Sequence, residues 1–223
     1  MANNKKRIDK IIYRRIILFV FSTALYRWVV LHIIPYIRLT CYYTSFRGWR
    51  YMRGYKLLEL GNFILTNDKW KLTGFLIPGE WTHAALCVTR DSEFEIAEMT
   101  HTNFTRSTFF DLCKEATRVS IWECPNWDSE YIHNVLIPTC LSFKNTKYDV
   151  KFEQGTKALA CSEIVFESDK ERRMGASDED ILGLGILYVS PTGLSKAANV
   201  RCKWDSDEET QPVWDEEIQM ETT

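Results

Sequence analysis

The sequence lacks the cysteine patterns that mark a metal-binding or disulfide-bonded domain. Its seven cysteines contain no Cys-x-x-Cys pair and no Cys/His spacing typical of zinc; they lie at positions 41, 87, 113, 124, 140, 161 and 202. An odd number of cysteines scattered through apolar stretches favours reduced, mostly buried thiols and a reducing compartment. The cysteines therefore predict neither a structural metal site nor a disulfide framework.

A cleavable secretion signal is also missing. No small-x-small cleavage site follows the first apolar run, and no small residue precedes Cys41 as a lipoprotein signal requires. The run itself, residues 16–37, would extend about 33 Å as a helix. Arg27, His32 and Pro35 interrupt it, and basic residues flank it almost equally on both sides. A membrane-spanning helix and a helix lying in an anionic interface both remain open, and we favour the second.

Acidic residues are almost absent from the first quarter of the chain. Residues 1–56 contain twelve Lys and Arg against Asp9 alone, whereas residues 203–223 contain eight Asp and Glu against Lys203. Aromatic residues alternate with arginines between 41 and 56, which is typical of a membrane interface. The same composition could stack on single-stranded nucleic acid or form a merely solvated helix, but no RNA-binding signature accompanies it. We expect an anionic membrane surface as a partner, no nucleic acid, and a location on the cytoplasmic side of a membrane.

Length and composition predict one moderate domain with two extensions. The chain has 223 residues, 45% of them hydrophobic, which can fill a sizeable core. We expect a basic and apolar helical extension over 1–56, a folded domain over 57–203, and an acidic tail over 204–223 that has little apolar surface to bury.

Two alternating stretches predict a β-hairpin that carries a histidine and a glutamate. Residues 82–89 and 94–99 alternate between apolar and polar side chains, and Arg90-Asp91 between them suits a tight turn. A turn centred there places His83 directly opposite Glu98. Opposed side chains in an antiparallel pair have Cβ atoms about 5 Å apart, so the carboxylate can hold the imidazole. This is the base and orienting residue of a nucleophilic triad.

A cysteine in a suitable local setting supplies the missing nucleophile. Residues 158–167 carry apolar side chains at helical spacing after the Gly155-Thr156 break, which places Cys161 in the first turn of a helix. The unpaired backbone N–H groups and the positive end of the helix dipole favour the thiolate there. Cys161, His83 and Glu98 are therefore the predicted catalytic residues.

These residues stand in an order that resembles a known family. The stretches that carry the resemblance are Gly61 to Thr66, Ile77 to Leu86, Glu98, Tyr148-Asp149 and Cys161-Ser162-Glu163. Together they resemble the circularly permuted, papain-like NlpC-type cysteine hydrolases, the YiiX-like amidases in particular, with lecithin–retinol acyltransferases as more distant relatives. The family usually has Asp where this chain has Asn62.

The resemblance implies an α+β fold, in which an antiparallel sheet packs against the cysteine helix. It also implies a substrate-binding role for Tyr148 and Asp149. Elsewhere the pattern predicts a strand over 118–123, a helix over about 128–143 that is interrupted at Pro138, and a last strand or a buried connection over 181–189.

The combined prediction is a cysteine amidase, peptidase or acyl hydrolase that needs no metal and no organic cofactor. Its substrate would carry an amide or an ester, on a peptide, a cell-wall peptide or a lipid. The alternative is a catalytically silent module of the same fold that docks a membrane or protein partner through its charged ends.

Overall fold

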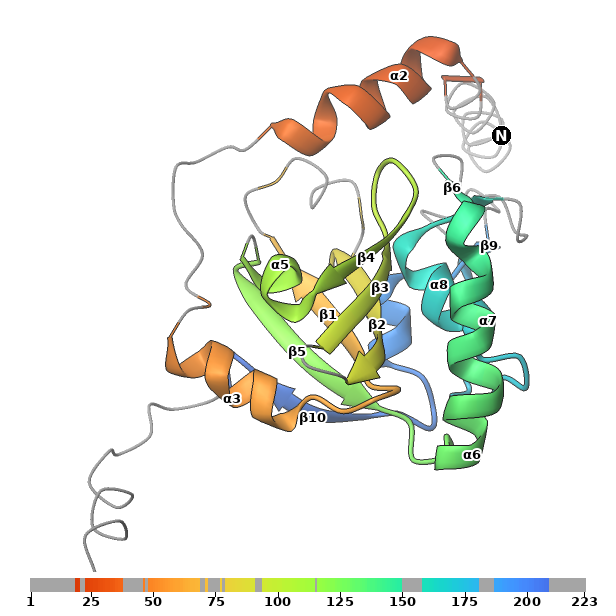
Figure 1. Cartoon of the computed structure of the whole chain (residues 1–223). Helices are drawn as coiled ribbons and strands as arrows, with labels where there is room; N and C mark the ends of the chain where they lie inside the picture. Colours follow the sequence, from red (N-terminus) through yellow and green to blue (C-terminus); the bar gives the residue numbers. More distant parts are fainter. Residues whose placement is uncertain are drawn as a thin grey trace, which may run out of the picture.

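The computed structural model describes residues 19–20, 23–37, 46, 48–68, 71, 77, 79–90, 94–114, 116–149, 158–180 and 187–208. Within these residues, a six-stranded antiparallel sheet forms the centre of the molecule, as Figure 1 shows. Its strands stand in the order β10-β5-β1-β2-β3-β4. They are β1 (Phe63–Asn67), β2 (His83–Arg90), β3 (Phe94–Met99), β4 (Phe104–Thr108), β5 (Arg118–Glu123) and β10 (Arg201–Asp205).

Both faces of this sheet are covered by buried clusters. Successive strand residues point to opposite sides, so one strand can contribute to both clusters. Phe63 and Leu65 of β1 belong to one buried cluster, whereas Ile64 between them belongs to the other. The first cluster packs against four helices: α6 (Ser129–Tyr131), α7 (Ile137–Ser142), α8 (Cys161–Ser168) and α9 (Pro191–Ser195). The second packs against α3 (Trp49–Leu57) and α5 (Phe109–Cys113). Strands β1 and β2 are consequently apolar on both sides, and their polar side chains lie at the strand ends.

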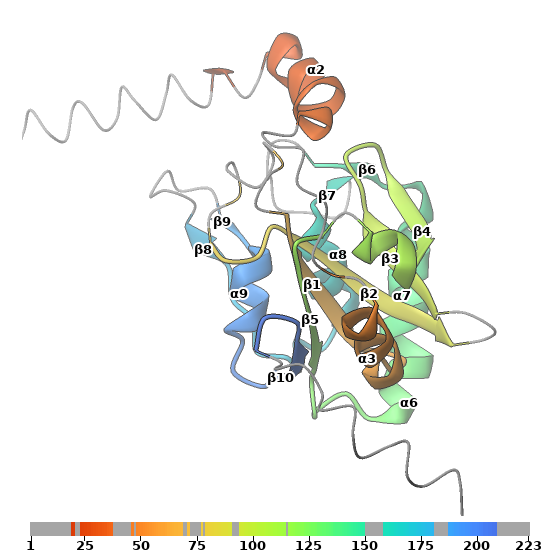
Figure 2. The same cartoon turned by 90° about the vertical axis from the view of Figure 1, so that its left-hand side faces the viewer.

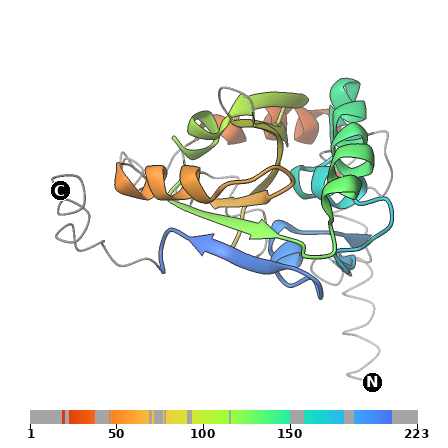
Figure 3. The same cartoon turned by 60° about the horizontal axis from the view of Figure 1, so that its bottom comes forward.

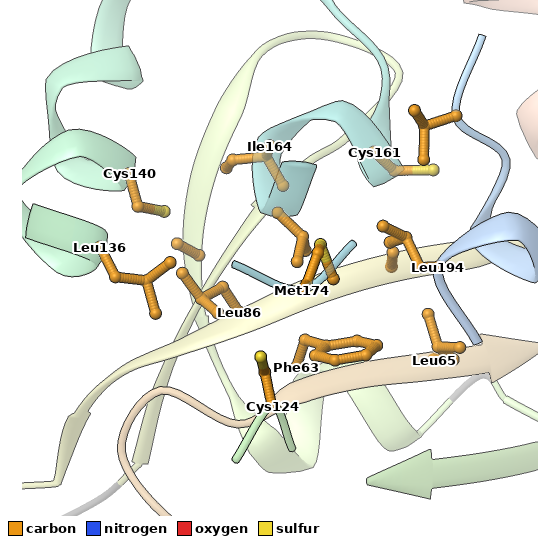
Figure 4. Packing of buried hydrophobic residues seen from close by; sticks show 14 of the residues in the cluster. Phe63, Leu65, Leu86, Cys124, Leu136, Cys140, Cys161, Ile164, Met174 and Leu194 are labelled. Atoms are coloured by element: carbon orange, nitrogen blue, oxygen red, sulfur yellow. The ribbon is translucent and has the colours of Figure 1, made fainter. Parts of the chain in front are cut away.

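The first cluster surrounds the cysteine helix. Figure 4 shows Ile164 of α8 on the side of the helix that faces the sheet residue Leu86, with Leu136 and Met174 in the same cluster. Ile164 and Leu86 are fully buried. This packing fixes α8 against the sheet and thereby sets the position of its first residue.

A helix with an interruption runs over 129–145, as the sequence predicts. Asp128 caps it by accepting a hydrogen bond from the Tyr131 N–H at 2.8 Å. A π-helical turn, η2 (Ile132–Leu136), separates α6 from α7, and η3 (Phe143–Asn145) ends the segment. Proline lacks the N–H needed for the regular ladder, and the wider turn ends at Leu136, two residues before Pro138.

Two short two-stranded sheets complete the described part. Strand β6 (Lys147–Tyr148) pairs in parallel with β7 (Ala158–Leu159), directly before α8. Strand β8 (Glu179–Asp180) pairs with β9 (Leu187–Tyr188); most of the strand predicted within 181–189 lies outside the described residues. The sequence predicts the strand over 118–123 with its bounds, but not β4 or β10. Figure 3 shows β10 alongside β5 at the edge of the sheet.

The basic and apolar extension contributes two separate parts. Phe46 and α3 pack on the second face of the sheet, where Tyr51 and Tyr55 contact the ring of Phe109. Helix α2 (Ala24–His32) and the 3-10 turn η1 (Ile34–Tyr36) lie instead over one end of the sheet, as Figures 1 and 2 show. None of the helices in the described part of the chain has the length and apolar content needed to cross a bilayer.

Candidate active site

Cys161 is the first residue of α8, as the sequence predicts. The strand-like Ala160 precedes it, and Figure 4 shows the cysteine side chain at the first helical turn. Cys161 is 1% exposed and belongs to the first buried cluster. The helix begins here because the Glu163 carboxylate accepts a hydrogen bond from the Ala160 N–H at 2.7 Å, as in a capping box.

His83 and Glu98 are bonded to each other, although their strand register differs from the predicted one. His83 Nε2 lies 2.8 Å from Glu98 Oε2. Glu98 is opposite Ala85 in the ladder and not opposite His83, so the predicted register is wrong by two residues. Ala85 and His83 are two positions apart on one strand and therefore share a face of the sheet. The two side chains meet diagonally.

A β-bulge in β2 brings Glu98 to the correct face. Three residues separate the pair Arg90 and Phe94, where a two-residue turn was predicted. That longer connection alone would set His83 opposite His101 and turn Glu98 away. The register then shifts by one residue between Cys87 and Thr89, which restores the face that His83 and Glu98 share. His101 instead bonds Tyr36, whose hydroxyl lies 3.2 Å from its Nε2.

Ser107 of β4 is a site residue that the sequence reasoning missed. Its Oγ donates a hydrogen bond to Glu98 Oε1 at 2.5 Å, while Oε2 holds His83. Burial raises the pKa of Glu98, but the bonds from His83 and Ser107 outweigh it and leave that pKa below its ordinary value. The carboxylate is therefore both charged and fixed in direction. The only signal in the sequence was a short polar stretch without clean alternation, which did not predict a strand.

His83 is in turn bonded to Cys161. Burial alone would lower the pKa of His83, but the charge and hydrogen bond of Cys161, followed by those of Glu98, raise it to about 10. Because Glu98 engages Nε2, Nδ1 is left to face the thiol. The imidazole thus stands between a sulfur and a carboxylate, which is the geometry of a nucleophile, a base and an orienting group.

The two residues predicted to bind substrate have different surroundings. Tyr148 lines the same cavity as Cys161, and burial followed by the charge of Cys161 raises its pKa well above the ordinary range. Asp149 is 5% exposed, does not line that cavity, and donates its backbone N–H to the Leu159 carbonyl at 3.1 Å. Asp149 also acts electrostatically on Glu163, whose pKa burial raises to about 7.

A cavity of about 710 Å³ opens onto these side chains. Its lining includes Cys161, His83, Glu98 and Ser107, together with Tyr36 and His101. A space of this size accommodates a peptide or acyl group of moderate length. Asn62, where the related family usually has Asp, lies outside the cavity lining; its Oδ1 accepts from the Glu59 N–H at 2.9 Å and closes the turn before β1.

An antiparallel sheet that carries the histidine, packed against a later helix that begins with the cysteine, defines the papain-like class with its usual chain order permuted. The sequence model of the permuted papain-like amidase family YaeF/YiiX, C92, matches residues 58–209. The chain belongs to this family.

One solved structure shows the same fold. It is the metalloprotein yiiX from Escherichia coli O157:H7, with a TM-score of 0.55 and 15% sequence identity. The match covers 69% of this chain and 98% of that one. No curated protein matches the chain. Within the described residues, no group of three or more His, Cys, Asp or Glu side chains is placed to hold a metal ion.

Proposed function

We propose that the protein cleaves an amide or an ester through a thioester on Cys161, with His83 as the base and Glu98 as the orienting residue. Family membership supports a cysteine amidase or peptidase at a coarse level. The observation that carries the finer proposal is the single imidazole bonded to Glu98 on one side and to Cys161 on the other.

The first half-reaction forms the acyl-enzyme. The Cys161 thiolate attacks the carbonyl carbon, and a C–S bond forms as the carbonyl oxygen becomes an oxyanion. In this proposal the backbone N–H of Cys161 donates to that oxyanion; one such donor contributes about 3 kcal/mol in other enzymes. The tetrahedral intermediate collapses, the C–N or C–O bond breaks, and His83 gives its proton to the leaving nitrogen or oxygen.

The second half-reaction frees the enzyme. A water molecule attacks the thioester carbon, His83 takes its proton, and the C–S bond breaks to return the thiolate and a carboxylic acid. An amine or a lipid alcohol can take the place of water, which makes the same chemistry an acyl transfer. Glu98, held by Ser107, keeps Nε2 protonated so that Nδ1 exchanges the proton in both steps.

The test is labelling with a thiol-reactive probe at about pH 6. The probe has to be small, because Cys161 is only 1% exposed. The five other described cysteines have a raised pKa, with burial as the main cause in each; they are Cys87, Cys113, Cys124, Cys140 and Cys202. Cys202 is exposed and has a pKa of about 11, so Cys202→Ala is the matched control. We expect labelling of the wild type and of Cys202→Ala, and none of Cys161→Ala.

The same variants are assayed for hydrolysis of amide and ester substrates and for thermal unfolding. Loss of turnover in a folded Cys161→Ala supports the proposal. Labelling that follows Cys202, or turnover that persists without the Cys161 thiol, contradicts it. A folded wild type in which Cys161 does not react favours the alternative, a catalytically silent module that binds a partner.

A further inference from the structure

Large exposed apolar side chains gather on one segment of the molecule. Of the nine in the described part of the chain, seven lie between residues 19 and 37. The most exposed are Leu25 (72%), Phe19 (71%) and Tyr36 (70%), and Trp28 is 54% exposed. Scattered exposed apolar residues are ordinary, but a contiguous group marks a surface that meets a partner.

Helix α2 presents large apolar side chains outward as well as inward, with the exposed His32 at its end. Leu25 and Trp28, three positions apart, share the exposed side, whereas Tyr26, Val29 and Val30 are partly buried. A helix on the surface of a water-soluble protein normally presents charged or polar residues to the solvent. The residues on the outward face of α2 are therefore of the kind found on a helix face that is covered by another surface.

This segment contributes Tyr36, which is 70% exposed, to the lining of the catalytic cavity, so the cavity reaches the surface there. The Tyr36 hydroxyl lies 3.2 Å from His101 Nε2, and their rings meet edge to face with centroids 5.5 Å apart. Both residues line the cavity that contains Cys161. Figures 1 and 2 place α2 over the end of the molecule where the β3–β4 connection and β6 lie. What covers the outer side of α2 therefore lies next to the cavity.

We propose that this surface docks on an anionic lipid bilayer. We call it the α2–η1 surface and define it by Leu25, Trp28, Ile33, Tyr36 and Ile37, each more than a third exposed. Tryptophan and tyrosine are the residues that favour the level of the lipid headgroups.

The charge of the surrounding sequence favours a lipid surface of negative charge over an apolar protein groove. No acidic residue occurs between Asp9 and Glu59, and basic residues stand on both sides of the α2–η1 surface in the sequence. An apolar helix face flanked by lysine and arginine binds a leaflet by apolar burial and by attraction to anionic headgroups. Docking in this orientation sets the mouth of the cavity against the membrane.

The substrate class follows from this orientation, and this step rests on the proposed function. The carbonyl attacked by Cys161 belongs to an ester or amide carried by a molecule anchored in the same membrane. A substrate free in solution has to pass between the bilayer and the cavity mouth, whereas an anchored one diffuses to it in two dimensions.

The experiment measures flotation of the full chain with vesicles of phosphatidylcholine alone or mixed with phosphatidylglycerol, each at low and high salt. The test variant is Leu25→Glu/Trp28→Glu, whose two sites lie outside the catalytic cavity. The matched control is Met52→Glu on α3, where an apolar residue about as exposed (50%) as Trp28 (54%) lies away from the α2–η1 surface. Circular dichroism and thermal unfolding establish that each variant is folded.

We expect the wild type and Met52→Glu to float with the anionic vesicles at low salt and the double variant to lose this binding by at least about tenfold. Absence of flotation by the wild type, equal flotation of the double variant, or an equal loss in Met52→Glu overturns the proposal. Binding that resists carbonate extraction also overturns it, in favour of a spanning segment. Probe labelling of Cys161 in the same samples reports on the proposed chemistry independently.

Discussion

The buried carboxyl of Glu163 makes the stability of this protein depend on pH in a direction opposite to that of most carboxylates. Its side chain is 6% exposed, and burial, with the charge of Asp149 as a further cause, raises its pKa from 4.5 to about 7. The folded state therefore holds a proton that the unfolded state has released. Stability from this group is fully present below pH 4.5 and is lost as the pH rises through 7.

The size of this effect follows from about 1.36 kcal/mol per pKa unit. On acidification from pH 8 to pH 5, protonation of Glu163 raises the free energy of unfolding of the wild type by roughly 2 to 3 kcal/mol. Glu163→Gln keeps an oxygen that accepts from the Ala160 N–H but cannot titrate. We therefore expect the free energy of unfolding of the wild type, measured by urea denaturation, to rise on acidification relative to that of Glu163→Gln.

A matched control separates this group from the general effect of acid. Glu130 is also a first-turn glutamate, at the start of α6, but its side chain is exposed. Glu130→Gln should reproduce the pH dependence of the wild type, and only Glu163→Gln should flatten it. If both variants follow the wild type between pH 8 and pH 5, the raised pKa of Glu163 is refuted.

Further predictions concern the triad and one tight turn. His83→Ala should lower kcat by about 10²- to 10⁴-fold, and Glu98→Gln by less, because a mispositioned imidazole still transfers protons; equal kcat in wild type and His83→Ala would contradict the assigned base. Ser107→Ala removes one hydrogen bond to a charged group and should cost about tenfold in kcat without loss of fold, which steady-state kinetics and circular dichroism measure together. Gly79→Ala should destabilise by about 2 kcal/mol or more in urea, because its φ is +110° and a Cβ there meets a side chain of α9, whereas Gly48→Ala, with φ +59° and open space around it, should cost less.

The parts of the fold that sequence could predict are those whose signal is local. Strong alternation predicts β2, β3 and β5, and a cap with apolar spacing predicts the segment from Asp128 onward. Strands β4 and β10 were not predicted, since Phe104–Thr108 and Arg201–Asp205 contain mostly polar or charged residues. They form strands because the edges of neighbouring strands offer N–H and C=O groups for them to pair with, and that information comes from tertiary structure.

The candidate site shows the same limit at the level of single residues. The facing of His83 and Glu98 could be predicted from strand periodicity, but the register could not, because a bulge is invisible in the alternation of side chains. The observed register differs from the predicted one by two residues, which left the facing intact, whereas a difference of one or three would have turned Glu98 away. Ser107 could not be found at all, since its role depends on the pairing of an unpredicted strand.

Strand β10 has a consequence for how the chain is made. It pairs with β5 across Arg201–Asp205, and Asp205 accepts two hydrogen bonds from Arg118, from Nε at 2.9 Å and from Nη2 at 2.6 Å. During synthesis β5 is an open sheet edge, with unpaired N–H and C=O groups, until residue 205 has left the ribosome. Every residue of the predicted triad is made before that edge is closed. A chain that stops before Arg201 therefore contains the complete site on a sheet that is exposed to pairing with other chains.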